Sequence, residues 1–348
     1  MKKKKILVFS REHITNYGDP IIADCCEYLI KKVAKENGVA VETSIADVYE
    51  TNEQVIEKKV SNNDIIVYPG GGLNSTKFNK NLIDIINIVE RAGNKTIFIN
   101  AVGLLPYEEE SKNVAMLKEI FNSPSVVQVT TRGDFEALQK ILNPDKQQAA
   151  KWIFDPAMWV NEAYGISKKE SDVIGIGVIR AEIFQANGLD FPRPLVVHMY
   201  SSIINELEKR NKKWCMFTNG MEADHEFGLK LLAKLKRDPK IHMKHPTSKK
   251  SLVNTISGFE GVIASRMHAN IIAASLDIPT IGLVWNEKLN YFGKLLNSVD
   301  NFINYPHLID GKLIVDKLEN ALVSGYDLGS VGDVRARTLE TFKQIVKD

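Results

Sequence analysis

The sequence predicts an α/β protein made of two Rossmann-like domains that face a cleft. At 348 residues, the chain exceeds what one compact core usually organises, and typical domain sizes suggest about two domains. Short β-rich runs alternate with longer segments of helical period, which is typical of parallel α/β sheets. The alternation stops around residues 155–172, where turn-forming and charged residues follow no sustained period, and then starts again. These observations indicate two similar sheets joined at that junction.

The first half of the chain contains four apolar runs that predict buried strands, at residues 6–10, 65–68, 96–100 and 126–131. The segments between them have helical period. The helix after the first strand begins with Asp19, which can cap it, and Pro20, which suits a first turn. Its apolar residues repeat on one side until it ends near Lys35. We assign residues 1–160 to an N-terminal domain.

The same alternation continues after the junction. The predicted strands lie at residues 173–179, 214–218, 261–265 and 280–284, and the predicted helices at residues 195–209, 225–235, 251–256, 267–276 and 289–296. We assign residues 161–330 to a C-terminal domain. A last helix, within residues 331–348, has no following strand and is expected to pack on either domain.

The composition narrows the classes of function. Lys and Arg total 45 and Asp and Glu total 43, so no charge excess draws the chain to nucleic acid or to an anionic membrane. The apolar run after the N-terminal lysines is too short for a signal peptide, and no stretch has the roughly 20 apolar residues that cross a bilayer. We therefore expect a cytoplasmic protein. The cysteines have no metal-ligand spacing and should be buried, so no metal site is predicted; they are Cys25, Cys26 and Cys215.

Three basic side chains follow neighbouring predicted strands in the second half. Arg266 and His268 come after residues 261–265, and Lys288 comes after residues 280–284. Open α/β sheets bind ligands at the carboxyl ends of their strands, so we expect these side chains to converge on an anion in the cleft. Two cations can neutralise phosphate and carboxylate while the imidazole carries a proton. The structural alternative is an Arg266 paired with a surface carboxylate, a hydrogen-bonding His268 and a solvated Lys288.

Two turns in the first half are also unusual. "NYGDP" begins at Asn16 and follows the first predicted strand, and "YPGGGLNS" begins at Tyr68, at the end of another. Consecutive glycines let a substrate approach backbone N–H groups, although the spacing matches neither a Walker loop nor a dinucleotide fingerprint. A tight turn at residues 70–72 and plain helix capping by Asp19 explain these motifs equally well.

Arginines close two further predicted strands. Arg132 either faces His268 across the cleft or pairs with Asp134. Arg180 precedes residues 181–194, a predicted loop with two phenylalanines and two prolines. This loop is either a lid, a surface on which a sugar stacks, or an irregular connection.

Taken together, these motifs resemble the polysaccharide pyruvyl transferase family. The resemblance rests on "NYGDPIIAD", "YPGGGLN", "TTRGDFEAL", "FDPAMWV" and "ASRMHANIIAASLDIPTIGLVWNEK", which occur in the family's order between residues 16 and 288. It implies a GT-B-like fold with a donor side in the C-terminal domain and an acceptor side in the N-terminal domain. It also implies transfer of the enolpyruvyl group of phosphoenolpyruvate onto a sugar of a cell-surface glycan or its precursor, with ketal formation and release of phosphate.

The resemblance implies roles for individual residues. His268 would be the general acid, aided by Arg266, and its pKa should be lowered by the helix start and two cations and raised again by the bound donor. Phosphoenolpyruvate is the co-substrate and no other cofactor is expected. The donor would be bound by Arg132, Arg266 and Lys288, and the acceptor by Asn16, Asp19, Gly71, Gly72, Asn74 and Arg180.

Alternatives remain open for the function. A GT-B-type glycosyltransferase would use the same cations for a nucleotide sugar, and a non-catalytic glycan-binding relative would keep the fold without turnover. The expected partners are phosphoenolpyruvate and a sugar or glycan, not nucleic acid. The sequence leaves open whether the acceptor is lipid-linked, whether the protein associates peripherally with a membrane, and which oligomer it forms.

Overall fold

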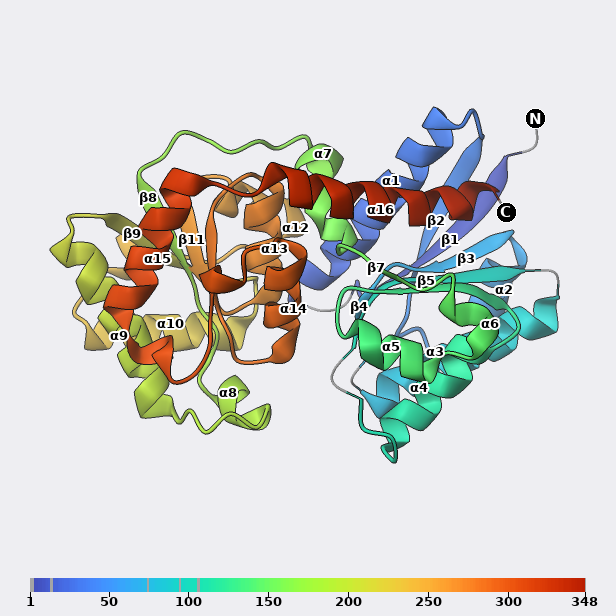
Figure 1. Cartoon of the computed structure of the whole chain (residues 1–348), viewed down its shortest axis with the longest axis horizontal. Helices are drawn as coiled ribbons and strands as arrows, with labels where there is room; N and C mark the ends of the chain where they lie inside the picture. The colour runs from blue at the N-terminus through green and yellow to red at the C-terminus, as the bar shows by residue number, and fades with distance from the viewer. Residues whose placement is uncertain (1–2, 13–14, 74, 94, 105–106, 348) are drawn as a thin grey trace. The chain divides into compact units, whose positions relative to one another are not determined.

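The computed structural model describes residues 3–12, 15–73, 75–93, 95–104 and 107–347 (Figure 1). The chain forms two compact units. Unit 1 contains residues 1–14, 19–156 and 332–348, and unit 2 contains residues 15–18 and 157–331. The main division at residue 156 lies within the junction segment of the sequence. Residues 15–18 belong to unit 2, although the segments before and after them in the chain belong to unit 1.

Unit 1 is built on a parallel sheet with strand order β2-β1-β3-β5-β6-β7, and β4 pairs with β5. Its strands in the described residues are β1 (Lys4–Ser10), β2 (Val41–Asp47), β3 (Ile65–Tyr68), β4 (Gly71–Gly72), β5 (Thr96–Gly103), β6 (Val126–Thr131) and β7 (Lys151–Trp152). Its helices are α1 (Gly18–Glu36), α2 (Glu53–Ser61), α3 (Thr76–Ala92), α4 (Lys112–Asn122), α5 (Phe135–Ile141) and α6 (Pro144–Gln147).

Unit 2 has its own parallel sheet, with strand order β10-β9-β8-β11-β12-β13. Its strands in the described residues are β8 (Val173–Gly177), β9 (Lys213–Phe217), β10 (Met243–Lys244), β11 (Gly261–Ala264), β12 (Thr280–Leu283) and β13 (Phe302–Ile303). Its helices are α7 (Val160–Tyr164), α8 (Glu182–Ala186), α9 (Arg193–Lys209), α10 (Glu222–Lys234), α11 (Pro239–His242), α12 (Lys249–Ile256), α13 (Met267–Ser275), α14 (Glu287–Leu295) and α15 (Gly311–Ser324).

These sheets form because their central strands are apolar throughout. Every residue of β3, β11 and β12 is buried, as expected for parallel strands covered by helices on both faces. The eight strands predicted from the sequence are all present, with ends that differ by at most three residues. The α/β prediction with two parallel sheets is therefore confirmed.

The prediction missed five strands. β2 was assigned to a segment of helical period, but Val41–Asp47 pairs in parallel with β1 at the edge of the sheet. Most of its residues are only half-buried or exposed, so it lacks the apolar run that reveals a central strand. The other missed strands, β4, β7, β10 and β13, have two residues each, and their pairing depends on neighbouring strands.

The last helix, α16 (Leu328–Lys347), begins near the predicted position, and its residues from 332 onward belong to unit 1. Phe342 and Ile345 are fully buried, and the Thr338 hydroxyl accepts a hydrogen bond of 3.1 Å from the Phe154 backbone N–H. The final helix thus completes the core of the unit in which the chain begins (Figure 1).

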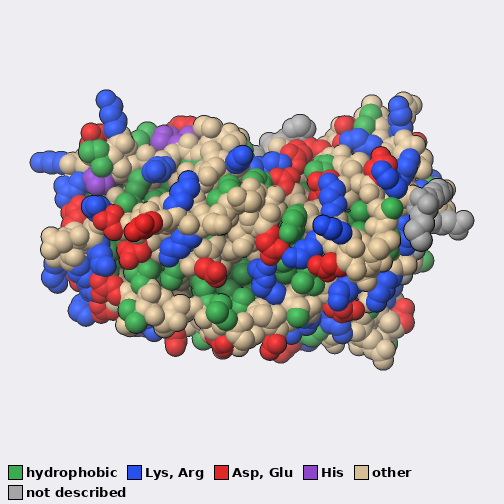
Figure 2. Space-filling view, turned by 90° about the horizontal axis from the view of Figure 1, so that it is seen from above, with side chains coloured by type: hydrophobic (Ala, Val, Ile, Leu, Met, Phe, Trp, Pro, Cys, Tyr) green, Lys and Arg blue, Asp and Glu red, His purple; other side chains and the backbone are tan. Residues whose placement is uncertain are grey.

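The surface agrees with the balanced composition. On the face seen in Figure 2, basic and acidic side chains are interspersed. All three cysteines are buried, as predicted. No helix in the described part of the chain combines the length and the apolar character that a membrane span requires.

Candidate functional site

The carboxyl ends of three adjacent strands in unit 2 carry the basic residues of the candidate site. β8, β11 and β12 lie side by side in the sheet, and Arg180, Arg266 and Lys288 follow them in turn. Parallel strands end at a common edge, so the topology places these residues at one edge of the sheet. Arg266 occupies the N-cap position of α13 and makes no side-chain cap there. The start of α13 therefore adds its partial positive charge to the same edge.

Two of these arginines meet at one buried carboxylate. Asp224, in the first turn of α10, is fully buried. Its Oδ2 accepts hydrogen bonds from Arg266 Nε at 2.9 Å and Nη2 at 2.6 Å. Its Oδ1 accepts from the Arg180 backbone N–H at 3.1 Å and from Arg180 Nη1 at 3.3 Å. The partner of Arg266 is thus a buried carboxylate, not a surface one, and Arg180, predicted to bind the acceptor, lies beside Arg266.

His268 lies in the first turn of α13, and its side chain packs against Gly18. The residue is only 5% exposed. A Cβ atom added to Gly18 would come within 2.4 Å of His268 Cβ and 2.5 Å of Nδ1. The glycine of "NYGDP" therefore leaves the space that the imidazole fills.

The same motif is attached to unit 2 by its other residues. The Tyr17 backbone N–H donates to the Asn219 carbonyl at 3.0 Å, and its hydroxyl donates to the Thr247 carbonyl at 2.8 Å. Asn16 and Gly18 thus belong to the unit that holds His268, while Asp19 belongs to unit 1. Asp19 lies one residue inside α1, which begins at Gly18, so it occupies the first turn rather than the predicted cap.

Lys288 rests on an aromatic ring at the start of α14. Its Nζ lies 4.4 Å from the Trp285 ring centroid, a cation–π contact. Trp285 Nε1 donates a hydrogen bond of 2.6 Å to the carbonyl of Ser265, the residue before Arg266. The half-buried Lys288 is thus positioned through Trp285 against the turn that carries Arg266.

The buried side chain of Tyr200 connects the carboxyl ends of two strands that carry these cations. The Tyr200 hydroxyl accepts from the Ile179 backbone N–H at 3.0 Å and shares a hydrogen bond of 3.1 Å with Ser265 Oγ. Burial raises the pKa of Tyr200 to about 12, so the hydroxyl stays protonated at neutral pH. This network connects the ends of β8 and β11 and holds their turns in register.

Several residues of this edge were not predicted. Asp224, Tyr200 and Trp285 act through contacts between segments distant in sequence, which no local pattern reveals. Asn219 is different, because it is the second residue after β9 and obeys the same strand-end rule that selected Arg266. It is 1% exposed, and its side-chain amide has no hydrogen-bond partner among the described residues. A buried amide of this kind is expected to have a partner, and a bound ligand would supply one.

In unit 1, the strand ends carry a second pair of arginines. Arg11, directly after β1, donates from Nη2 to the Gly72 carbonyl at 2.7 Å and to the Tyr68 hydroxyl at 3.3 Å. Its guanidinium also lies 4.3 Å from the Phe78 ring centroid. Arg11 was not predicted as a site residue, although it follows a predicted strand as Arg132 does. Arg11 holds the glycine-rich turn in place.

Arg132 is almost fully buried and forms an ion pair with Asp155, in the "FDPAMWV" motif. Asp134, the partner considered from the sequence, accepts a hydrogen bond of 2.9 Å from the Ala137 backbone N–H at the start of α5. Burial lowers the pKa of Arg132 to about 10, although the nearby Asp19 carboxylate opposes this shift. Arg132 and Asp19 thus interact within unit 1, whereas Arg266, His268 and Lys288 belong to unit 2.

The glycine run forms a closely packed turn. Gly70 has φ +131° and Gly71 has φ +111°, values that favour glycine. A Cβ atom at Gly71 would also lie 3.2 Å from the Tyr68 hydroxyl oxygen. Gly71 and Gly72 form β4, which pairs with β5. Asn74, also predicted to bind the acceptor, lies outside the described residues.

Residues 181–194 do not form the sugar-stacking surface considered above. Phe184 and Phe191 are fully buried, and their ring centroids lie 5.3 Å apart. The segment also contains the short helix α8. Both aromatic rings therefore belong to the core of unit 2.

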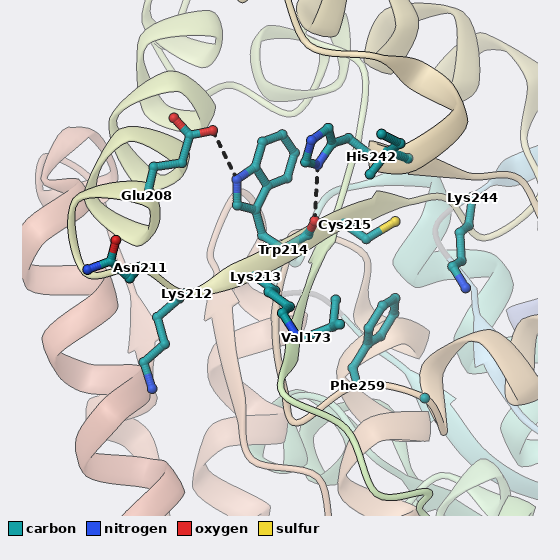
Figure 3. A pocket seen from close by; sticks show the side chains of 12 residues that line it. Val173, Glu208, Asn211, Lys212, Lys213, Trp214, Cys215, His242, Lys244 and Phe259 are labelled. Atoms are coloured by element: carbon teal, nitrogen blue, oxygen red, sulfur yellow. Dashed lines mark hydrogen bonds between the residues drawn. The ribbon is translucent and has the colours of Figure 1, made fainter.

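A cavity of about 550 Å³ lies elsewhere in unit 2 (Figure 3). It includes Val173 and Lys213, the first residues of β8 and β9, so it reaches the amino ends of these strands. Trp214 and His242 stack at 4.1 Å in its wall. None of the predicted site residues lines this cavity. In the described ranges, no three His, Cys, Asp or Glu side chains are grouped so that they could hold a metal ion.

Known structures share this fold at low sequence identity. UDP-GlcNAc 2-epimerase from Neisseria meningitidis, solved with UDP-GlcNAc, has a TM-score of 0.59 at 11% identity, and the match covers 99% of this chain and 100% of that one. The corresponding enzyme from Methanocaldococcus jannaschii has a TM-score of 0.56 at 12% identity, with 97% and 99% covered. An Anabaena protein in complex with UDP-glucose has a TM-score of 0.55 at 10% identity, with 99% and 98% covered. The fold is GT-B-like, as predicted.

Comparison of the sequence with protein families identifies the family of this chain. A comparison with curated proteins finds no match. Residues 5–287 match the family described as polysaccharide pyruvyl transferase, and this range includes all the motifs quoted above up to Glu287. Because the match covers well over half of the chain, the protein belongs to the polysaccharide pyruvyl transferase family.

Proposed function

We propose that the protein transfers the enolpyruvyl group of phosphoenolpyruvate to a sugar of a cell-surface glycan or its precursor. The family implies a transferase that acts on polysaccharide. One observation carries the donor assignment: Arg266, Lys288 and His268 follow adjacent strands or begin a helix at one sheet edge of unit 2. Phosphoenolpyruvate carries a carboxylate and a phosphate, and guanidinium and ammonium groups bind these anions well.

In the proposed reaction, His268 protonates the methylene carbon of phosphoenolpyruvate, which becomes a methyl group. The positive charge that develops at C2 is attacked by a sugar hydroxyl, whose proton returns to the imidazole. A second hydroxyl then forms the other C–O bond of the ketal as the bond from C2 to the phosphate oxygen breaks. The proton of this hydroxyl leaves with phosphate. Arg266 and Lys288 offset the charge of the donor throughout, and phosphoenolpyruvate is the only co-substrate.

The acceptor would be bound, as proposed from the sequence, by Asn16, Asp19, Gly71, Gly72, Asn74 and Arg180, with Arg132 as a further donor contact. The contact of Gly18 with His268 supports a role for the "NYGDP" motif close to the proposed acid. The Arg11 contact with the Gly72 carbonyl supports a rigid glycine turn. We also propose that the protein works in the cytoplasm, where phosphoenolpyruvate is available.

The test of this function is incubation of the purified protein with phosphoenolpyruvate and a panel of β-galactosyl, mannosyl and N-acetylhexosamine acceptors. We expect phosphate release and a product whose mass equals that of the acceptor plus a ketal-linked pyruvyl group. Absence of phosphate release with every acceptor, together with thermal stabilisation by UDP-glucose, would instead support a nucleotide-sugar glycosyltransferase. Binding of phosphoenolpyruvate without any turnover would support a non-catalytic relative.

The role of His268 gives a sharper prediction. The variant His268→Ala should lose about 10²- to 10⁴-fold in turnover, because general acid catalysis typically contributes that much. Its dissociation constant for phosphoenolpyruvate, measured by calorimetry, should change by only a few fold, since the cations remain. His198→Ala, at an exposed position on α9, is the matched control. Loss of donor binding with unchanged turnover would exclude His268 as the acid.

A further inference from the structure

Asp224 links two arginines that the sequence assigned to different substrates. Its carboxylate is fully buried and accepts four hydrogen bonds, two from Arg180 and two from Arg266. Buried carboxylates persist when their hydrogen bonds and charges are satisfied in this way. The single negative charge of Asp224 therefore interacts with two guanidinium groups, those of Arg180 and Arg266, at the proposed donor edge.

The geometry leaves part of each guanidinium for a ligand. Nε and Nη2 of Arg266 both converge on Asp224 Oδ2, and Nη2 also lies 3.1 Å from Met221 Sδ. These contacts fix the guanidinium plane, and Nη1 of Arg266 has no hydrogen bond within the described residues. Arg180 is held through its backbone N–H and Nη1, while its side chain is 28% exposed. Its Nε and Nη2 likewise have no partner in the described ranges.

We infer that Asp224 is a positioning residue for the donor, which directs the remaining N–H groups of Arg180 and Arg266 toward the same anion. The inference rests on the proposed function and extends it. It assigns Arg180 to the donor, in place of the acceptor role proposed from the sequence. Asp224 does not contact the substrate in this scheme, since both of its oxygens are occupied by the arginines.

If the Asp224 charge is removed, a positioning role and simple charge balance predict opposite changes in donor affinity. Removal of the Asp224 charge makes the edge more positive, and Coulomb attraction alone would then bind a trianionic donor more tightly. If Asp224 orients the arginines, its loss releases two flexible side chains, and the donor must order them on binding. Positioning therefore predicts weaker donor binding despite the added positive charge.

The experiment measures phosphoenolpyruvate binding by calorimetry, and KM and kcat by phosphate release, for Asp224→Asn. We expect the dissociation constant and KM to rise about tenfold or more, with a smaller fall in kcat, because misplaced binding groups are costly. Asp172→Asn is the matched control, since it removes one exposed carboxylate paired with Lys213 in the same unit. The control should bind the donor as the wild type does.

Each outcome decides one question. Unchanged or tighter binding by folded Asp224→Asn overturns the positioning role, whereas failure of the wild type to bind phosphoenolpyruvate rejects the proposed function itself. Circular dichroism establishes whether the variant folds. If it does not, Asp224→Glu keeps the charge but moves the carboxylate by one methylene, and we again expect weaker binding. Wild-type affinity in folded Asp224→Glu would equally overturn the inference.

A double-mutant cycle provides a readout that a purely structural role would not produce. If Asp224 acts on the donor through Arg180 and Arg266, its replacement should have little further effect on KM once both arginines are changed to Gln. Additive effects on KM of Asp224→Asn and the combined Arg180→Gln and Arg266→Gln change would mean that Asp224 acts on the donor independently of both arginines, contrary to the inference.

Discussion

At the scale of single residues, the space around His268 depends on a residue about 250 positions earlier in the chain. Gly18 stands where any larger residue would meet the imidazole, with His268 Nδ1 only 2.5 Å from the position of an added Cβ. Its backbone φ is not in the left-handed region that favours glycine. The requirement for glycine here is therefore one of space, and it links the "NYGDP" motif to the proposed general acid.

We expect Gly18→Ala to reduce turnover about 10²-fold, because a displacement of about 1 Å in a catalytic group has effects of that size. Donor affinity should change little, since Arg266 and Lys288 are not touched. Steady-state phosphate release and calorimetry measure the two quantities. Gly332→Ala is the control, since a Cβ atom at Gly332 meets nothing within 4 Å. Full activity in Gly18→Ala would show that the ring position is not restricted by this contact.

At the scale of secondary-structure elements, α10 connects the site with a pair of stacked histidines. Asp224 lies in its first turn, and the next residue, His225, stacks on His245 with ring centroids 4.2 Å apart. Burial and the neighbouring His245 lower the pKa of His225, while Glu222 and Glu226 oppose the shift. The folded protein therefore holds His225 in its neutral form more strongly than the unfolded chain does.

The lowered pKa of His225 determines how the stability of the folded protein changes with pH. The unfolded chain binds a proton at His225 near its ordinary pKa of 6.5, before the folded protein does, so stability is lost as the pH falls below about that value. In His225→Phe, which keeps an aromatic ring in the stack, the unfolding temperature should fall less between pH 7 and pH 5. Thermal unfolding across this range measures the difference. His198→Phe, at an exposed position of α9, should retain the wild-type profile; equal profiles for all three proteins would contradict the assignment.

The length of an element decides how well the sequence predicts it. The run β11, α13, β12 and α14 was predicted within about two residues at each end, because long apolar periods dominate these segments. The strands β4, β7, β10 and β13 have two residues each, too few for any period to be read. The same strand-end rule that found Arg132 and Arg180 would have found Arg11 and Asn219, so those omissions do not reflect a lack of signal.

At the scale of the whole molecule, the chain crosses between its two units more than once. Residues 15–18 belong to unit 2 and residues 332–348 to unit 1. The last helix contributes Phe342, Ile345 and Val346 to the buried core of unit 1, and Lys4 Nζ donates a hydrogen bond of 3.0 Å to the Val346 carbonyl. Unit 1 therefore needs both ends of the chain.

This arrangement predicts a local effect of a distant substitution. Phe342→Ala should destabilise unit 1 by about 3–5 kcal/mol, the usual cost of removing a buried phenylalanine. Hydrogen exchange followed by mass spectrometry should show faster exchange in β1, β3 and β5, and little change in β8, β9 and β11. Gln344→Ala, at an exposed position of the same helix, should change stability by less than about 0.5 kcal/mol. Equal loss of protection in both sheets would show that the units unfold together.

The sequence by itself determined the alternation of strands and helices, the two sheets and the cations at the strand ends, since these depend on local apolar period and on neighbours in the chain. Only the tertiary structure decided which groups meet. Asp224 lies 44 residues from Arg180 and 42 from Arg266 in the sequence. Gly18 packs against His268, although the two residues are far apart in the sequence. Such contacts result from the packing of whole elements, which local patterns do not specify. The same reason explains why the pairing of Arg132 with Asp155 was not predicted.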